Sequence, residues 1–370
     1  AFLAIRCWHP AFLRGPLLPS LALGLAPGCV LRLLGCSSWA AHRIGIAAGL
    51  VVFMVAKRTL KLETLAVAAD HWPLVALSLA LVWIAPVCGA LRWRILLAAQ
   101  HIHLRFAESF RLGLVGLFFS QFIPGHTGGD IFRAYAIATG ARKAEAAILS
   151  VVLDRLLGLP PLLFLVLIGC ALNWDFLATP SFRPYAKVLG IVLATSVVVL
   201  TAVLWPTSKG GGSATDAAAD SKANWLARIT RQFRIAIAAV RASPGATAAA
   251  LAFGLGGHLS TLAACIFAGM AAEVQGIPLL RYLLLVPMGL VVNAIPAAPG
   301  GVGQGEMAFA ALFEAASGLA DNAPRGAAVM LCLRLGQILF GAVGGAIYAL
   351  GRHGFTGRPP APAAARPDSL

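Results

Sequence analysis

The stretch FIPGHTGGDIFRAYAIATGARKAEAAILSVVLDRLLG, residues 122–158, decides the fold of this chain. Pro124 and Gly125 end one apolar run, and a second apolar run begins further on. Proline lacks a backbone N–H and glycine lacks a Cβ, so the two together interrupt a helix. Non-helical backbone is tolerated at membrane depth only where it is buried in protein or lines a wet cavity. The stretch therefore predicts a helix that is broken inside a membrane.

Composition supports a membrane as the solvent. Of the 370 residues, 59% are hydrophobic and only 12% are charged, whereas soluble domains carry about 25% charged residues. The net charge is +15, and the Lys and Arg residues lie between apolar runs. That placement is typical of cytoplasmic loops and of contacts to anionic lipid. We expect a multi-pass protein of the bacterial inner (plasma) membrane, with no nucleic-acid partner.

The apolar runs predict two kinds of helix. A second interrupted run, 281–301, ends in VVNAIPAAPGG, and the first such run is 106–125. One interrupted segment in each half indicates a transporter-like site between repeats, although both could be ordinary spans with proline-terminated ends. Full spans are expected at 44–60, 73–91, 146–170, 186–205, 247–272 and 326–350. The fold is therefore predicted to be all-α, with about six full spans and two re-entrant or broken helix pairs, and it is compatible with an inverted repeat.

The chain divides by composition into a long membrane domain and flanking segments. We expect residues 1–38 to be a poorly specified N-terminal extension, 39–350 the membrane domain and 351–370 a disordered tail. A cytoplasmic loop is expected at 206–246, with a basic amphipathic helix at 222–241. This helix is expected to lie on the membrane surface, or else to pack on neighbouring loops.

Charged residues follow the first break. Gly128 and Gly129 allow a ligand or another helix to approach the backbone closely. Asp130 is expected to cap the next helix, with Arg133 one turn further along on the same face. These residues form the polar part of the first motif.

A second pair of charges lies deep in a span. Asp154 and Arg155 come eight to nine residues into the apolar run at 146–170, or roughly 12–14 Å along a helix. Charges at that depth are costly, and they mark a functional site that faces protein or water.

The second half repeats the arrangement. Pro299, Gly300 and Gly301 interrupt the chain, Glu306 begins the next helix, and Arg334 lies inside the last span. Each half thus carries a break, an acidic residue just after it and an arginine in a following span.

These motifs suggest an anion site. A helix N-terminus attracts phosphate, and Arg133, Arg155 and Arg334 could add charge-assisted contacts to a phosphodiester head group. The neighbouring carboxylates would hold the arginines when no ligand is bound, or would bind an amine on the head group. The alternative is that the same ion pairs only lock the helices together.

Three segments carry a resemblance to a known family: FFSQFIPGHTGGDIFR (118–133), VVLDRLLG (151–158) and IPAAPGGVGQGE (295–306). The chain resembles the flippase-like lysylphosphatidylglycerol synthase transmembrane-region family over roughly residues 40–350. The positions that match the family motifs are Pro124, Gly125, Gly128, Gly129, Asp130, Arg133, Asp154, Arg155, Pro299, Gly300, Gly301 and Glu306.

The resemblance implies lipid translocation. Full-length synthases continue into a cytoplasmic aminoacyltransferase domain, whereas this chain ends at Leu370, so we expect the flippase-like part without synthase activity. The expected function is translocation of an anionic or zwitterionic phospholipid or a lipid-linked head group. Expected partners are membrane lipids with phosphate head groups, and a lipid-modifying enzyme partner and a homo-oligomer remain open.

Two other functions compete with translocation. An intramembrane lipid-phosphate enzyme could use Ser120, His126 and Asp130, which are close in sequence. An accessory or scaffold subunit could dock through the helix at 222–241. We expect no catalytic residue, metal or cofactor. The sequence contains no GxxxxGK[ST] motif for ATP, so transport is expected to be driven by gradients, membrane potential or downstream consumption. No acidic cluster suited to a magnesium-dependent transferase is visible in the sequence.

Overall fold

The structure is a computed structural model, and it describes residues 62–100, 102–122, 127–141, 144–204, 238, 242–294 and 302–350. Every regular element within these residues is a helix, which confirms the all-α class. Four of the predicted segments lie wholly or almost wholly outside the described residues: the extension 1–38, the span 44–60, the loop 206–246 and the tail 351–370.

The helices fall into two groups along the chain. The first group comprises α4 (Leu62–Asp70), α5 (Trp72–Val82), α6 (Ile84–Ala98), α7 (Phe106–Phe122), α8 (Thr127–Ala141), α9 (Ala144–Leu172), α10 (Trp174–Leu177) and α11 (Arg183–Leu204). The second comprises α13 (Pro244–Ala271), the 3₁₀ turn η3 (Leu279–Arg281), α14 (Tyr282–Ala294), α15 (Gln304–Ser317) and α16 (Asn322–Leu350).

Four of the described helical stretches are long and apolar enough to cross a membrane. They are Trp72–Ala98, Ile148–Leu172, Pro244–Ala271 and Asn322–Leu350. They confirm the spans predicted at 73–91, 146–170, 247–272 and 326–350. The span predicted at 186–205 falls on α11, a helix of 22 residues that is not among these four.

The two interrupted runs form helix hairpins. Helix α7 packs against α8, and α14 packs against α15. The four helices contain 17, 15, 13 and 14 residues, fewer than the roughly 20 that a full crossing needs. Two helix pairs are therefore present where the interrupted runs were predicted, while the breaks themselves, 123–126 and 295–301, lie outside the described residues.

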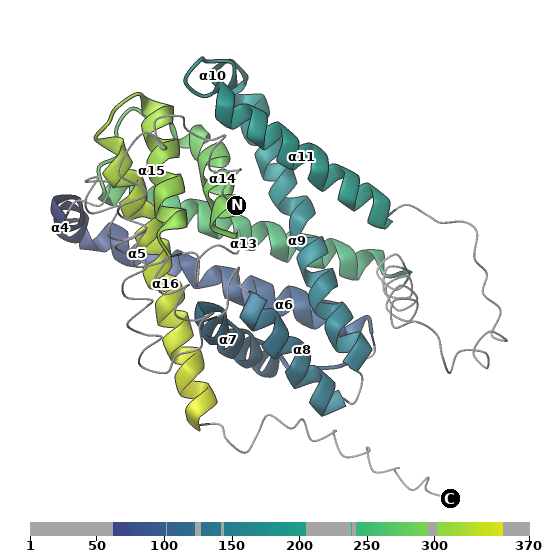
Figure 1. Ribbon diagram of the computed structural model, residues 1–370. Coiled ribbons are helices and arrows are strands. Elements are labelled where there is room, and N and C mark those ends of the chain that lie inside the picture. Colours follow the sequence, from purple (N-terminus) through teal and green to yellow (C-terminus); the bar gives the residue numbers. More distant parts are fainter. Residues whose placement is uncertain are drawn as a thin grey trace, which may run out of the picture.

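The two halves repeat one order of elements: a long helix, a short hairpin and a second long helix. The last members, α9 and α16, contain 29 residues each. In Figure 1, α9 rises from the α7–α8 hairpin towards α10, whereas α16 descends from the α14–α15 hairpin. The hairpins lie at opposite ends of the molecule and the long helices run in opposite directions, so the repeat is inverted.

Helix α16 joins the halves, because it packs both on α15 of its own hairpin and on α7 of the other. Its contact with α7 depends on glycine, since a Cβ at Gly344 would overlap the carbonyl of Leu114. Close approach through small residues is the usual way in which membrane helices associate. Nearer its N-terminus, α16 packs on α15, where a Cβ at Gly326 would lie 2.6 Å from the Phe309 carbonyl oxygen and 2.8 Å from Phe313 Cβ.

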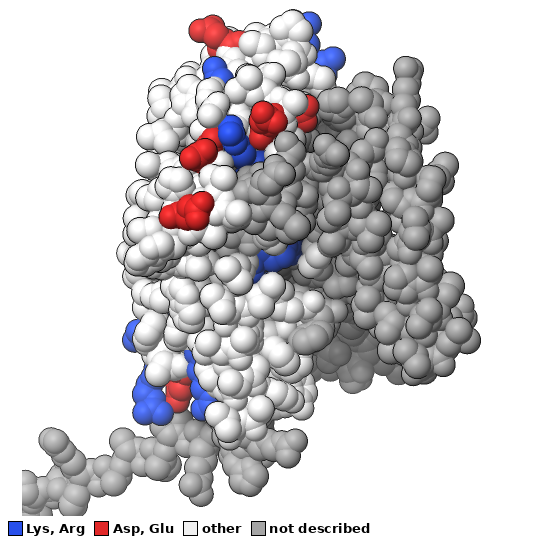
Figure 2. All heavy atoms as spheres, turned by 90° about the vertical axis from the view of Figure 1, so that its left-hand side faces the viewer, with Lys and Arg blue, Asp and Glu red and all other residues white. Residues whose placement is uncertain are grey.

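The distribution of charge fits a membrane setting. Figure 2 shows charged side chains over the upper part of the face in view and at its lower end, with a mainly uncharged band between them that is interrupted by one Lys or Arg patch. Large apolar side chains are exposed on the long helices, among them Phe164, Leu167, Ile338 and Leu339. Such a band suits contact with lipid tails.

Candidate functional site

Five charged residues from three helices meet in the first half. We call this set the first-half cluster, and its members are Arg92 on α6, Asp130 and Arg133 on α8, and Asp154 and Arg155 on α9. Asp154 lies at its centre, where Arg92 Nε donates to Asp154 Oδ1 at 2.8 Å. Arg133 Nη1 donates to Asp154 Oδ2 at 3.2 Å. One carboxylate thus holds two guanidinium groups that are far apart in sequence.

Asp130 and Arg155 complete the cluster. Arg155 Nε donates to Asp130 Oδ2 at 2.8 Å, and Arg155 Nη2 lies 2.8 Å from the same oxygen. Asp130 is also 3.9 Å from Arg133 Nη1, which links this pair to Asp154. The side chain of Arg155 is 62% exposed, whereas that of Asp154 is 5% exposed. The cluster therefore reaches from a buried carboxylate to an exposed arginine.

An aromatic ring supports the buried side of the cluster. The guanidinium carbon of Arg133 lies 4.0 Å from the centroid of the Trp93 ring, which is a cation–π contact. Trp93 is fully buried, and its indole N–H donates to Ser150 Oγ at 3.2 Å. The Nε atom of Arg133 is buried without a hydrogen-bond partner. The cluster therefore holds a buried donor that its own acceptors leave unsatisfied.

The positive and negative side chains of the first-half cluster are unequal in number. Three arginines face two aspartates, so the first-half cluster carries one net positive charge. A net charge inside a span is expensive. The arrangement is therefore suited to an anion.

The glycines after the first break bring α8 close to α7. The N–H of Gly129 donates to Ser120 Oγ at 3.0 Å. A Cβ at Gly129 would lie 2.6 Å from both the Gly116 carbonyl oxygen and Ser120 Oγ. The backbone at Gly129 is thus approached closely by another helix, α7. Pro124 and Gly125 lie outside the described residues.

The prediction that Asp130 caps α8 is wrong. Helix α8 begins at Thr127, so Asp130 lies inside its first turn. Its carboxylate faces Arg155 and Arg133 instead. A negative charge in the first turn still interacts favourably with the helix dipole, so its placement remains compatible with the start of a helix.

The second half contains a smaller group, the second-half cluster of Asn293, Glu306 and Arg334. Arg334 Nη2 donates to Glu306 Oε2 at 2.9 Å and to Asn293 Oδ1 at 3.2 Å, while Arg334 Nε donates to Glu306 Oε1. Glu306 Oε2 also accepts the N–H of Gly303 at 2.9 Å, at the start of α15. The side chains of Arg334 and Glu306 are only 4% and 5% exposed. This pair is electrically balanced and enclosed.

The structure brings together four of the predicted residues and adds one. Asp130, Arg133, Asp154 and Arg155 all join the first-half cluster, whereas Arg334 pairs with Glu306 in its own half. Gly128, in the first turn of α8, is buried. Pro299, Gly300 and Gly301 lie outside the described residues.

Arg92 is not among the residues predicted for the site, because the span that precedes it was predicted to end at residue 91. The run predicted at 73–91 extends as a helical stretch to Ala98, so Arg92 lies within the apolar stretch and not in a loop. The sequence does indicate a longer span, because the apolar run continues beyond Arg92 with Trp93, Ile95, Leu96 and Leu97.

The fold and these clusters define a class: a multi-pass α-helical membrane protein that buries ion pairs within an inverted repeat. The chain belongs to the family of the lysylphosphatidylglycerol synthase TM region, whose family model matches residues 41–345. No match was found among curated proteins or among solved structures. The family is one of membrane proteins related to lipid modification or translocation.

Proposed function

We propose that this protein moves lipids with phosphate-bearing head groups between the leaflets of a bacterial inner membrane. Anionic or zwitterionic phospholipids and lipid-linked head groups are the candidate substrates. Membrane lipids are then its principal partners.

The first-half cluster is the observation that carries the proposal. Ionisable side chains inside a span are costly and mark substrate pathways by default. Here five of them meet around Asp154, and arginine outnumbers aspartate. Guanidinium groups bind phosphate by paired, charge-assisted hydrogen bonds.

The architecture supports the same conclusion. Inverted repeats with interrupted helices are typical of transporters, and their substrates bind near the interface between the repeats. In this chain, α16 packs against the hairpins of both halves. A movement of one half against the other would therefore change the packing of α16 on α7 or on α15.

A test uses purified protein in liposomes with fluorescent phosphatidylglycerol in both leaflets. An impermeant quencher reveals how fast inner-leaflet lipid reaches the outside. Wild type should make inner-leaflet lipid accessible, and empty liposomes should not. Asp154→Asn should slow transfer by at least about tenfold, because Arg92 and Arg133 both lose the carboxylate that holds them.

The matched control is Glu108→Gln, which also converts an acid to an amide. Glu108 pairs with Arg105 at an exposed position outside both clusters, so transfer should stay near wild type. Both variants should elute as single folded species in detergent. If folded wild-type protein moves neither phosphatidylglycerol, phosphatidylethanolamine nor a lipid-linked sugar, the proposal is refuted.

A further inference from the structure

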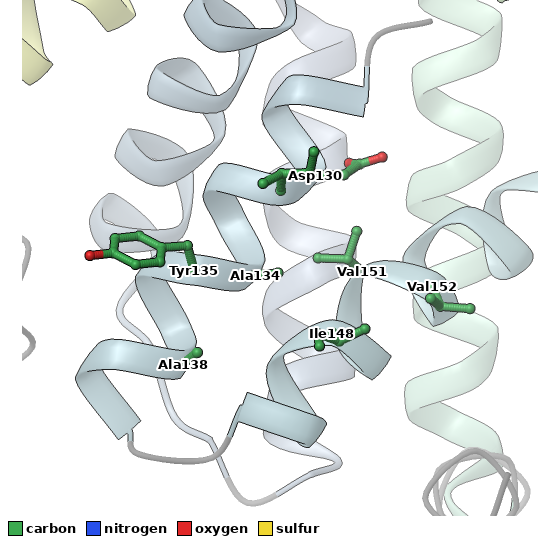
Figure 3. Close-up of a pocket in the computed structure, with 8 residues that line it drawn as sticks. Asp130, Ala134, Tyr135, Ala138, Ile148, Val151 and Val152 are labelled. Carbon is green, nitrogen blue, oxygen red and sulfur yellow. The ribbon is translucent and has the colours of Figure 1, made fainter. Parts of the chain in front are cut away.

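A groove runs between α8 and α9 beside the first-half cluster. Its volume is about 440 Å³, within the range of roughly 300–1,000 Å³ that is usual for ligand sites. Its lining consists of Asp130, Ile131, Ala134, Tyr135, Ala138, Ile148, Val151 and Val152. In Figure 3, Asp130 lies at one end, and Ala138 and Ile148 lie at the other.

The groove is apolar along its length. Asp130 is the one charged residue of its lining. Ile131, Tyr135, Ile148 and Val152 are all more than 40% exposed, although each is large and hydrophobic. From Asp130 to Ala138 the α8 wall is about 12 Å long at 1.5 Å per residue. Beside membrane-spanning helices, such a surface is suited to a hydrocarbon chain.

The polar end of the groove lies beside Arg155. Val151 and Val152 precede Arg155 by four and three residues, so all three lie on one side of α9. The exposed guanidinium of Arg155 is bound to Asp130, the polar residue of the groove. Arg155 is therefore the exposed arginine of a cluster with one net positive charge, and it lies where the groove begins.

We propose that this groove holds one acyl chain of an anionic phospholipid, with the phosphodiester of that lipid at Arg155. The inference rests on the proposed function and names its substrate class and access site. A head group with one net negative charge neutralises the one net positive charge of the cluster. A zwitterionic lipid leaves that charge uncompensated, so the site selects phosphatidylglycerol over phosphatidylethanolamine.

The second-half cluster does not offer the same chemistry. Glu306 and Arg334 balance each other and are buried. In the first half, by contrast, the exposed side chain of Arg155 lies beside an apolar groove. This combination of charge and groove assigns the lipid to the first half.

The experiment measures lipid binding separately from transport. The protein is reconstituted in phosphatidylcholine liposomes that contain a trace of phosphatidylglycerol or phosphatidylethanolamine with a photoactivatable acyl chain. After illumination, mass spectrometry of peptides locates and quantifies the adducts. Wild type should be labelled on α8 and α9, more strongly by phosphatidylglycerol than by phosphatidylethanolamine.

A groove-filling variant tests the position. Ala134→Phe adds bulk to the α8 wall without changing charge, and it should reduce α8–α9 labelling by about tenfold. Ala171→Phe is the matched control, because Ala171 is exposed near the far end of α9 and is not part of the groove. Should Ala134→Phe fail to fold, Ile148→Trp fills the groove from its exposed wall and replaces it. Unchanged labelling in a folded groove-filling variant would overturn the inference.

A charge variant tests the head-group contact. Arg155→Gln removes the net charge and should abolish the preference for phosphatidylglycerol, whereas Arg155→Lys should keep most of it. The expected loss is about tenfold, as for one charge-assisted contact. A preference that survives Arg155→Gln would show that the phosphate does not bind at Arg155.

The two proposals fail separately. If Ala134→Phe loses labelling but still transports lipid at the wild-type rate, the groove is not the access site and the translocator proposal stands. If wild type is labelled with the expected preference but moves no lipid, the groove binds lipid and the translocator proposal fails.

Discussion

At the residue scale, two acid–arginine pairs occupy matching positions but different environments. Asp130 and Glu306 lie in the first turns of α8 and α15. Arg155 is the twelfth residue of α9, and Arg334 is the thirteenth of α16. The first arginine side chain is 62% exposed and the second only 4%. Equivalent pairs thus lie in different environments: the first lies beside the groove between α8 and α9, and the second is enclosed between α15 and α16.

The enclosed pair should therefore be important for stability. Arg334→Gln leaves Glu306 as a buried charge without its arginine, and removing one partner of a buried pair costs about 3–5 kcal/mol. We expect a large fall in the unfolding temperature, measured in detergent by the loss of monodisperse protein on heating. The double variant Glu306→Gln with Arg334→Gln should recover part of this loss, since no unpaired charge remains.

Arg105→Gln is the control for that measurement. Its side chain is 86% exposed and pairs with Glu108, and a surface pair contributes at most about 1 kcal/mol. An Arg334→Gln protein as stable as Arg105→Gln would show that the Glu306–Arg334 pair does not hold α15 and α16 together.

At the scale of elements, the hairpins depend on close contacts between backbones. Gly129 brings α8 onto α7, and Gly344 brings α16 onto Leu114 of α7. A backbone carbonyl cannot rotate away as a side chain can, so both positions exclude a Cβ. The apolar runs that become helices can be predicted from the sequence, but the choice of neighbour follows from these contacts.

Gly344→Ala should separate α16 from α7. The added Cβ overlaps the Leu114 carbonyl, and overpacking of this kind costs about 1–3 kcal/mol. The thermal stability of the detergent-solubilised protein should fall accordingly.

Gly113→Ala, in α7 itself, is the matched substitution because a Cβ there meets nothing within 4 Å. It should leave stability unchanged or raise it by about 0.5–1 kcal/mol, since alanine favours helix over glycine. Equal effects of the two substitutions would contradict the close α7–α16 contact.

At the scale of the whole molecule, the inverted repeat gives the protein two opposite ends. Figure 1 shows the ends of α8 and α16 at one end of the molecule and α10 at the other. Arg142, Lys143 and Arg352 follow α8 and α16 directly in sequence. An excess of Lys and Arg marks cytoplasmic loops, so this end is expected to face the cytoplasm.

Cysteine labelling tests this orientation. In a background without the seven native cysteines, Thr139→Cys and Ala349→Cys should react with an impermeant maleimide only from the cytoplasmic side. Ser181→Cys, in the exposed connection between α10 and α11, should react only from the opposite side. Labelling of Thr139→Cys and Ser181→Cys from one side would rule out a crossing by α9.

The sequence by itself determined the class of the protein, four of its long apolar helices and most of the charged residues of the first-half cluster. These features are local, because hydropathy selects the spans and a charge within an apolar run is conspicuous wherever it pairs. Arg155, Asp154 and Glu306 could therefore be named in advance.

Only the tertiary structure decided which charges meet. Asp154 pairs with Arg92, which is 62 residues away, and its neighbour Arg155 pairs with Asp130. The net charge of the first-half cluster and the groove between α8 and α9 follow from that choice. Neither the net charge nor the groove can be predicted from local sequence, because both depend on how helices that are distant along the chain pack side by side.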